Sequence, residues 1–224
     1  DRRKHFGDDM VDTTSRPQSI KTDTWVPAQW DEYVAICEKP EYEKARSYYD
    51  NGWMRLEMAA LGPWHGRENS IVSKVVSLFA TLSVIRVVEL TNTSFRKAGE
   101  REGQPDIAFY LGDNFTLPPQ NNQPVYVNTY GAPQLVIEIA STTLGDDLGR
   151  KRLLYERLGV REYWVVNVAS SKVIAFAVEN GGSGEIRESQ VLPGLALATV
   201  EEAMERSSTE DDGAIARWLI QTFQ

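Results

Sequence analysis

The run Gln134-Leu-Val-Ile-Glu-Ile-Ala140 decides how the rest of the chain is interpreted. It is almost continuously apolar, as expected of a central strand that is covered on both faces. Glu138 interrupts the run, and a carboxylate in such a strand is costly to bury without a compensating partner. The run therefore predicts a central strand that carries one functional carboxylate.

A second carboxylate opens a neighbouring strand. Asp106 follows Pro105 at the start of the strand-like run 106–111. Carboxylate oxygens are ligands that hard divalent cations prefer, and one ion shared by two carboxylates compensates both charges. Asp106 and Glu138 together predict a site for Mg²⁺ or Mn²⁺.

Lys151 belongs to the helix expected over residues 146–158. Leu148, Lys151, Tyr155 and Leu158 are spaced so that they share one helical face, which places Lys151 within an apolar stripe. It is either a snorkelling surface group or an ammonium aimed at the two carboxylates, and the coincidence of all three residues favours the second. Such a group suits metal-assisted phosphodiester hydrolysis, in which the ion acidifies a water and the ammonium stabilises developing charge.

Periodicity and turn residues place the other elements. Asp50-Asn51-Gly52, between two aromatic-rich runs, predicts a β-hairpin. The order of elements predicts an α/β fold with a mixed sheet, helices on both faces, and a crossover helix at 146–158. Residues 1–22 are expected to form an arm with little core of its own, and residues 23–224 a single domain. We expect helices over 27–38, 66–83, 146–158 and 214–223, and strands over 84–90, 106–111, 134–140, 162–168 and 172–178.

Composition limits the classes of protein. No apolar run approaches the roughly 18–20 residues of a membrane span, and no apolar segment follows the basic residues near the start, so we expect a cytoplasmic protein. A single cysteine, Cys37, cannot form an internal disulfide, and its helical setting indicates a small buried or half-buried side chain. The formal charge of −8 repels polyanions, so nucleic-acid binding would need a local basic patch.

Two groups of side chains are candidates for contact with nucleic acid. One is the basic set, in which interleaved Glu100, Glu156 and Glu162 favour the alternative of a solvated mixed-charge surface. The other is an aromatic set that could stack on bases, although its place on strands and helical stripes favours core packing. The basic set is Arg96, Lys97, Arg101, Arg150, Lys151, Arg152, Arg157 and Arg161, and the aromatic set is Tyr110, Tyr155, Tyr163 and Trp164.

Three segments together resemble a known family. They are Gly103-Gln-Pro-Asp-Ile-Ala-Phe-Tyr110, Pro133-Gln-Leu-Val-Ile-Glu-Ile-Ala140, and Lys151-Arg-Leu-Leu-Tyr155 followed by Leu158-Gly-Val-Arg-Glu-Tyr-Trp164. The series resembles the bacterial Uma-two, or putative restriction endonuclease, family of the PD-(D/E)XK superfamily. The motifs are specific as a series and weak one by one. The resemblance runs from about Trp25 to Trp218 and implies a restriction-endonuclease-like core with an N-terminal hairpin elaboration.

The resemblance also implies roles for particular residues. Asp106 and Glu138 would be the metal ligands, and Lys151 would be the catalytic lysine, moved in this family from the strand into the helix. The sequence departs from the superfamily's E-x-K pattern, because Ala140 stands where the strand lysine would be.

Three further residues match positions of the family. Glu68 resembles an acidic residue that serves as an extra ligand, and the alternative is a carboxylate favoured by the helix dipole. His65 matches a family histidine, and the alternative is a helix cap or surface group. Glu57 lies on the hairpin strand, where alternation places Leu56 and Met58 inward and Glu57 outward.

The leading hypothesis is an Mg²⁺- or Mn²⁺-dependent endonuclease that hydrolyses DNA, with Glu68 and His65 as auxiliary residues. Because cleavage of both strands needs two sites, a homodimer is expected. The acidic balance and Ala140 motivate an alternative, a catalytically silent nuclease fold that serves as a binding or dimerisation module. A two-carboxylate glycosidase ranks last because it gives Lys151 no role.

Overall fold

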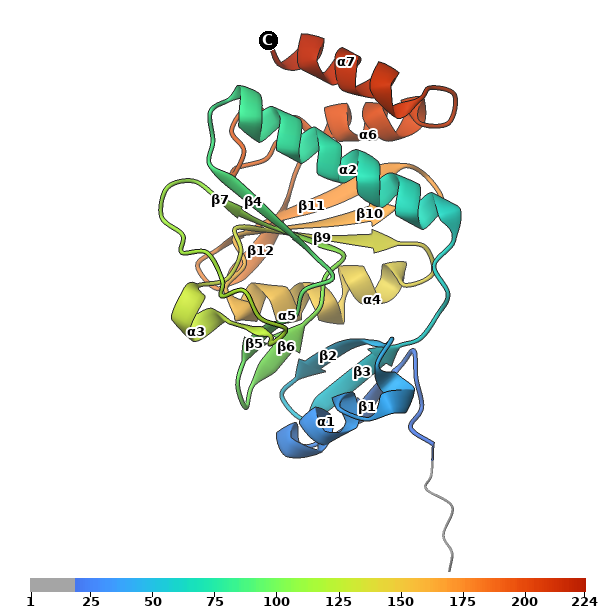
Figure 1. Ribbon diagram of the computed structural model, residues 1–224, viewed down its shortest axis with the longest axis vertical. Helices are drawn as coiled ribbons and strands as arrows, with labels where there is room; N and C mark the ends of the chain where they lie inside the picture. The colour runs from blue at the N-terminus through green and yellow to red at the C-terminus, as the bar shows by residue number, and fades with distance from the viewer. Residues whose placement is uncertain (1–18) are drawn as a thin grey trace, which may run out of the picture.

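Two six-stranded sheets organise residues 19–224, the part of the chain that the computed structural model describes (Figure 1). Residues 1–18 of the expected arm lie outside this part. The central sheet has the order β12-β11-β10-β9-β7-β4, with β4 (Val87–Thr91), β7 (Ile107–Leu111), β9 (Leu135–Ala140), β10 (Glu162–Asn167), β11 (Lys172–Glu179) and β12 (Gly182–Ile186). The peripheral sheet has the order β1-β3-β2-β6-β5-β8, with β1 (Trp25–Pro27), β2 (Arg46–Asp50), β3 (Trp53–Glu57), β5 (Phe95–Lys97), β6 (Arg101–Gly103) and β8 (Val125–Tyr126).

Helices cover both faces of the central sheet, as the sequence predicts. On one face lie α2 (Pro63–Leu82), α6 (Leu197–Arg206) and α7 (Asp212–Phe223). On the other face, α4 (Leu144–Leu148) and α5 (Arg150–Leu158) lie between the central and the peripheral sheet, and α1 (Trp30–Cys37) packs on the outer side of the peripheral sheet (Figure 1). The short helix α3 (Val127–Tyr130) follows β8. No helix among the described residues has both the length and the hydropathy of a membrane span.

The central strand β9 is buried at all six positions. It runs parallel to β10 through the α4–α5 crossover and antiparallel to β7, which confirms the mixed sheet. Because Ile107 pairs with Ile137, the register brings Asp106, one residue before β7, next to Glu138. The sheet itself therefore places the two carboxylates side by side.

The helix expected over 146–158 is broken in two at Gly149, where α4 ends and α5 begins. A Cβ at Gly149 would lie only 2.9 Å from the backbone oxygen of Gly145. The break therefore needs glycine, and it sets the angle at which α5 carries Lys151 into the space between the two sheets.

Substitution of Gly149 by alanine is expected to lower the free energy of unfolding by about 1–3 kcal/mol, because the new methyl group meets backbone rather than a flexible side chain. Gly145→Ala is the matched control, since a Cβ there meets no atom within 4 Å. Urea denaturation of both variants tests this expectation. Equal stability of Gly149→Ala and Gly145→Ala would show that the break does not need glycine.

The hairpin predicted at Asp50-Asn51-Gly52 is present, and both turn residues have positive φ, 42° at Asn51 and 87° at Gly52. The prediction that Glu57 faces outward is wrong: Glu57 is buried, whereas Met58 is 42% exposed. Leu56 packs in an apolar cluster with Tyr33 and Ile36 of α1, and Glu57 is on the opposite face of β3, as alternation requires. That opposite face is covered by α4 and α5 instead of solvent, and it carries Arg46 and Glu57 into the interior.

Candidate active site

Asp106 and Glu138 converge on one position, which the guanidinium group of Arg46 occupies. Each carboxylate is only 1% exposed. The Arg46 Nη1 atom lies 2.5 Å from Asp106 Oδ1 and 3.5 Å from Glu138 Oε2. The structure thus brings together the two carboxylates that the sequence singles out, with a guanidinium group between them.

Asp106 is held in its ionised form. Its Oδ2 atom accepts a hydrogen bond of 2.7 Å from the backbone N–H of Ile139, and His65 Nε2 lies 3.3 Å from its Oδ1 atom. Burial alone would raise the Asp106 pKa, but His65, the Arg46 charge and the Ile139 N–H together lower it below its usual value.

Glu138 differs from Asp106 in its environment. Its Oε1 atom accepts hydrogen bonds from the hydroxyl groups of Tyr48, at 3.0 Å, and Tyr155, at 2.8 Å. Burial raises the Glu138 pKa to about 8, although the charges of Lys151 and Arg46 oppose this rise. The two carboxylates therefore have pKa values displaced in opposite directions, as is common for acid–base pairs in active sites.

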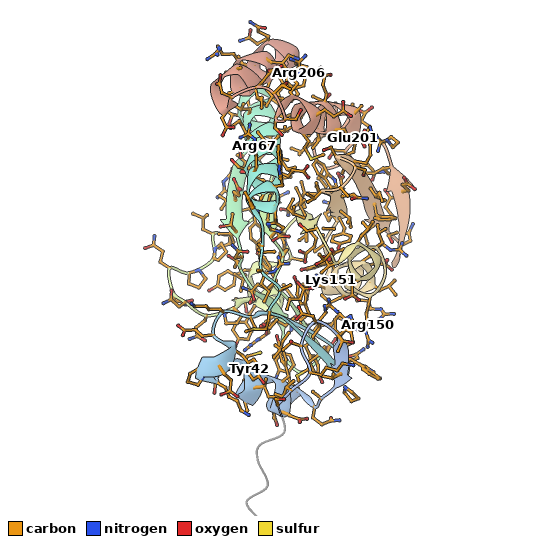
Figure 2. All side chains as sticks on the ribbon, turned by 90° about the vertical axis from the view of Figure 1, so that its right-hand side faces the viewer. Tyr42, Arg67, Arg150, Lys151, Glu201 and Arg206 are labelled. Carbon is orange, nitrogen blue, oxygen red and sulfur yellow. The ribbon has the colours of Figure 1, made fainter. Side chains whose placement is uncertain are left out.

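Lys151 is fully buried and does not snorkel to the surface (Figure 2). Its Nζ atom lies 2.6 Å from Glu57 Oε1 and 2.8 Å from Asp147 Oδ1. Burial lowers the Lys151 pKa, but the charges of Glu138, Asp147 and Glu57 raise it above its usual value, so Lys151 is a cation. Within residues 19–224 its ion pairs are with Glu57 and Asp147, which corrects the expectation that the ammonium points directly at Asp106 and Glu138.

Glu57 connects Arg46, which contacts Asp106 and Glu138, with Lys151. It accepts hydrogen bonds from Arg46 Nη2, at 2.9 Å, and Arg55 Nε, at 3.0 Å, and it pairs with Lys151. Sequence reasoning missed Arg46 and Asp147 entirely and assigned Glu57 to the surface. Arg46 alternates with Tyr48 on the hairpin strand, so both side chains lie on one face, but the alternation alone does not show that this face is buried.

The two auxiliary candidates have different positions. His65 is buried against Asp106 and belongs to the site. Glu68 is buried one turn further along α2, where its Oε1 atom accepts a hydrogen bond of 3.2 Å from Ser171. Its Oε2 atom is buried without a hydrogen-bond partner among the described residues. Within residues 19–224, no three or more His, Cys, Asp or Glu side chains form a ready metal-binding group.

Comparison with known proteins places the chain in a family. The model of the Uma2 (Uma-two) family, described as "putative restriction endonuclease", matches residues 30–211. The chain belongs to this family. A crystal structure of a putative nuclease of the DUF820 family from Anabaena variabilis superposes with a TM-score of 0.53 and 16% identity, over 80% of this chain and 99% of that chain. At this identity the likeness shows the fold alone. No curated protein matches.

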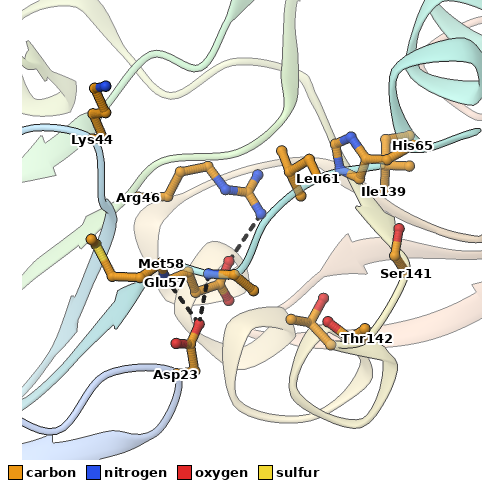
Figure 3. Close-up of a pocket in the computed structure, with 12 residues that line it drawn as sticks. Asp23, Lys44, Arg46, Glu57, Met58, Leu61, His65, Ile139, Ser141 and Thr142 are labelled. Atoms are coloured by element: carbon orange, nitrogen blue, oxygen red, sulfur yellow. Dashed lines mark hydrogen bonds and ion pairs between the residues drawn. The ribbon is translucent and has the colours of Figure 1, made fainter. Parts of the chain in front are cut away.

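A cavity of about 90 Å³ in this Uma2 protein is lined by Arg46 and His65, which both contact Asp106 of the carboxylate pair. Figure 3 shows the residues that line it. Basic groups of Lys44, Arg46 and His65 line it, together with the hydroxyl-bearing segment 141–143. The acidic groups Asp23 and Glu57 also border it. The cavity combines cationic and hydrogen-bonding groups next to Asp106 and Glu138.

The outer basic residues are mostly neutralised by nearby acids. Arg101 pairs with Asp50 and Glu100, and Arg157 also pairs with Asp50. This pairing supports the mixed-charge alternative for the surface. The aromatic set, Tyr110, Tyr155, Tyr163 and Trp164, is fully buried, and this confirms core packing; Cys37 is half-buried, as expected.

Glu68→Gln is expected to stabilise the protein at pH 8 by about 1–3 kcal/mol. Burial raises the Glu68 pKa in the folded protein to about 7, from an ordinary value of 4.5. The protonated form is thus favoured by folding, and this contribution to stability is complete below pH 4.5 and is lost as the pH rises through 7. Because glutamine is neutral at every pH, Glu68→Gln does not lose this stability as the pH rises.

Thermal or urea unfolding of Glu68→Gln and wild type from pH 4 to pH 8 measures this effect. The difference should vanish at the acid end and grow as the pH rises. A wild-type protein more stable than the variant at pH 8 would mean that the Glu68 carboxylate is stabilised in its ionised form.

Proposed function

We propose that this Uma2 protein is a divalent-cation-dependent endonuclease that hydrolyses phosphodiester bonds in DNA. The observation that carries the proposal is the convergence of two buried carboxylates, Asp106 and Glu138, on a single cation position. Membership of a family described as "putative restriction endonuclease" supports the nuclease chemistry. DNA as the substrate, and Mg²⁺ or Mn²⁺ as the cofactor, are inferences from the resemblance and the donor chemistry.

The residues present fit a small hard cation. Mg²⁺ is commonly held by one or two carboxylates and keeps several waters, so it does not need a cluster of three protein ligands. Asp106 Oδ1 and Glu138 Oε2 offer the oxygen pair, and the adjoining cavity offers room for water and substrate oxygens. When bound, such a cation polarises a phosphoryl oxygen and acidifies a water.

Side chains of the protein supply a positive charge near the cation position and hydrogen-bond donors for the substrate. Lys151 holds a fixed positive charge beside the carboxylates, and its pairing with Glu57 and Asp147 keeps it in place. Lys44 and His65 border the cavity, where they can donate hydrogen bonds to phosphate oxygens. Hydrogen bonds from the hydroxyl groups of Tyr48 and Tyr155 to Glu138 Oε1 hold this carboxyl group in place, with Oε2 directed at the cation position.

A second candidate function has its own supporting observation. Arg46 already neutralises the carboxylate pair, and Glu57 with Asp147 already neutralises Lys151. A centre that is closed by its own ion pairs suits a nuclease fold that binds or dimerises without catalysis.

Incubation of the protein with supercoiled plasmid DNA and Mg²⁺ or Mn²⁺ separates the two functions. The proposal predicts nicked or linear products that disappear when a chelator is added. Intact plasmid at all metal concentrations would favour the silent module. Because cleavage of both strands needs two centres, we also propose a homodimer, and a monomer in light scattering at working concentration would contradict it.

A further inference from the structure

Arg46 stands where the proposed function needs a divalent cation. We propose that Arg46 is a built-in counter-cation, which occupies the position between Asp106 and Glu138 and must withdraw before a divalent cation can bind there. This inference rests on the proposed function, because it concerns the same pair of carboxylates.

The contacts of Arg46 make it a direct competitor of a metal ion. A single nitrogen, Nη1, approaches the oxygens of both carboxylates, at 2.5 Å from Asp106 and 3.5 Å from Glu138. A guanidinium group has five N–H donors and no lone pair, and it stays protonated in proteins. It therefore cannot serve as a ligand, and a second cation on the same oxygens would face its full positive charge at short range.

The structure also shows how Arg46 is retained. Its other terminal nitrogen, Nη2, donates to Glu57 Oε2 at 2.9 Å, and its side chain is 13% exposed where it borders the cavity. When the guanidinium group shifts toward the cavity, Nη1 donates to water or to a substrate phosphate oxygen instead of Asp106, and Nη2 keeps its ion pair with Glu57. Figure 3 shows the guanidinium group of Arg46 at the cavity, with its dashed link to Glu57.

Competition of this kind lowers the apparent affinity for metal. The protein binds the ion only in the fraction of molecules from which Arg46 has withdrawn, so the apparent dissociation constant equals the intrinsic one divided by that fraction. Removal of the guanidinium group should then tighten Mn²⁺ binding by about 10- to 100-fold, the range expected when one charged hydrogen bond no longer has to be broken.

Titration calorimetry with Mn²⁺ tests the inference on the full chain. The proteins are wild type, Arg46→Met and the control Arg55→Met. Arg55 is somewhat more buried than Arg46, with 8% against 13% of the side chain exposed, and it also contacts Glu57, at 3.0 Å, but its other acidic partner is Asp146 rather than Asp106 or Glu138. We expect tighter Mn²⁺ binding in Arg46→Met alone, with circular dichroism used to confirm that each variant is folded.

The outcomes separate this inference from the proposed function. Equal or weaker binding by Arg46→Met, beside clear binding by wild type, overturns the role of Arg46 and leaves the metal site intact. An absence of Mn²⁺ binding by all three proteins overturns both.

Wild-type crystals soaked in Mn²⁺ give an answer that does not depend on the folding of any variant. Anomalous density between Asp106 and Glu138, with Arg46 moved beyond hydrogen-bond distance of Asp106, is the expected result. Density at that position with Arg46 unmoved, or no density there, overturns the inference.

Discussion

Replacement of Lys151 by methionine is expected to lower the free energy of unfolding by about 3–5 kcal/mol, the usual cost of removing one partner from a buried ion pair. The Lys151 side chain has no exposure, and Asp147 Oδ1 lies 2.8 Å from its Nζ atom. Glu57 would keep Arg46 and Arg55 as partners, but the Asp147 carboxylate would keep, among residues 19–224, only the hydrogen bond from Thr143. The loss should therefore come mainly from the uncompensated Asp147 carboxylate.

Two further variants show whether the loss of stability in Lys151→Met comes from its ion pair with Asp147. Arg150→Met is the control on the same helix, because Arg150 stacks over Trp25 and Trp53 and should cost about 1 kcal/mol or less. The double variant Lys151→Met/Asp147→Asn removes both charges and should recover part of the loss. Urea denaturation measures these three variants together with the single variant Asp147→Asn. A double variant that loses the sum of the two single effects would show that Lys151 and Asp147 are not energetically coupled.

Asp106→Ala is expected to lower the rate of metal-dependent plasmid cleavage by at least about 100-fold, since residues that merely surround a metal site already cost 10- to 100-fold when they are changed. The change removes an oxygen of the cation position, and it leaves Arg46 and His65 without their common partner. Initial rates at saturating Mg²⁺ measure the effect.

A matched substitution distinguishes loss of chemistry from loss of folding. Asp50 is also buried and also paired with arginines, Arg101 and Arg157, but it lies at the hairpin turn. Asp50→Ala should retain cleavage within about tenfold once the fraction of folded protein is allowed for, because its ion pairs are structural. Equal losses in Asp106→Ala and Asp50→Ala would mean that Asp106 has no special part in the reaction.

The long, periodic elements of the fold could be predicted from the sequence. The run 134–140 is apolar on both faces and forms β9, and the stripe at 66–83 forms α2. The short strands β5, β6, β8 and β12 were missed, because two to five residues with polar or glycine-rich composition carry no period. The helix α6 was also missed, although Leu197, Val200 and Met204 are buried at helical spacing and could have indicated it.

Residues of the candidate site could be predicted only where a charged residue interrupts an otherwise apolar segment. Glu138 interrupts an apolar strand and Lys151 interrupts an apolar helical stripe, so both are visible without a structure. Arg46 and Glu57 look like ordinary polar residues of a hairpin, because nothing local shows that α4 and α5 cover their face. The partners of Lys151 depend on the break at Gly149 and on the packing of two sheets, and both are tertiary properties.

Titration calorimetry of Mn²⁺ into wild type and Asp106→Ala tests most directly whether Asp106 and Glu138 form a cation site. Saturable binding near one ion per chain is expected in wild type, and its loss is expected in Asp106→Ala. Absence of binding to wild type, or equal binding to both proteins, would contradict it.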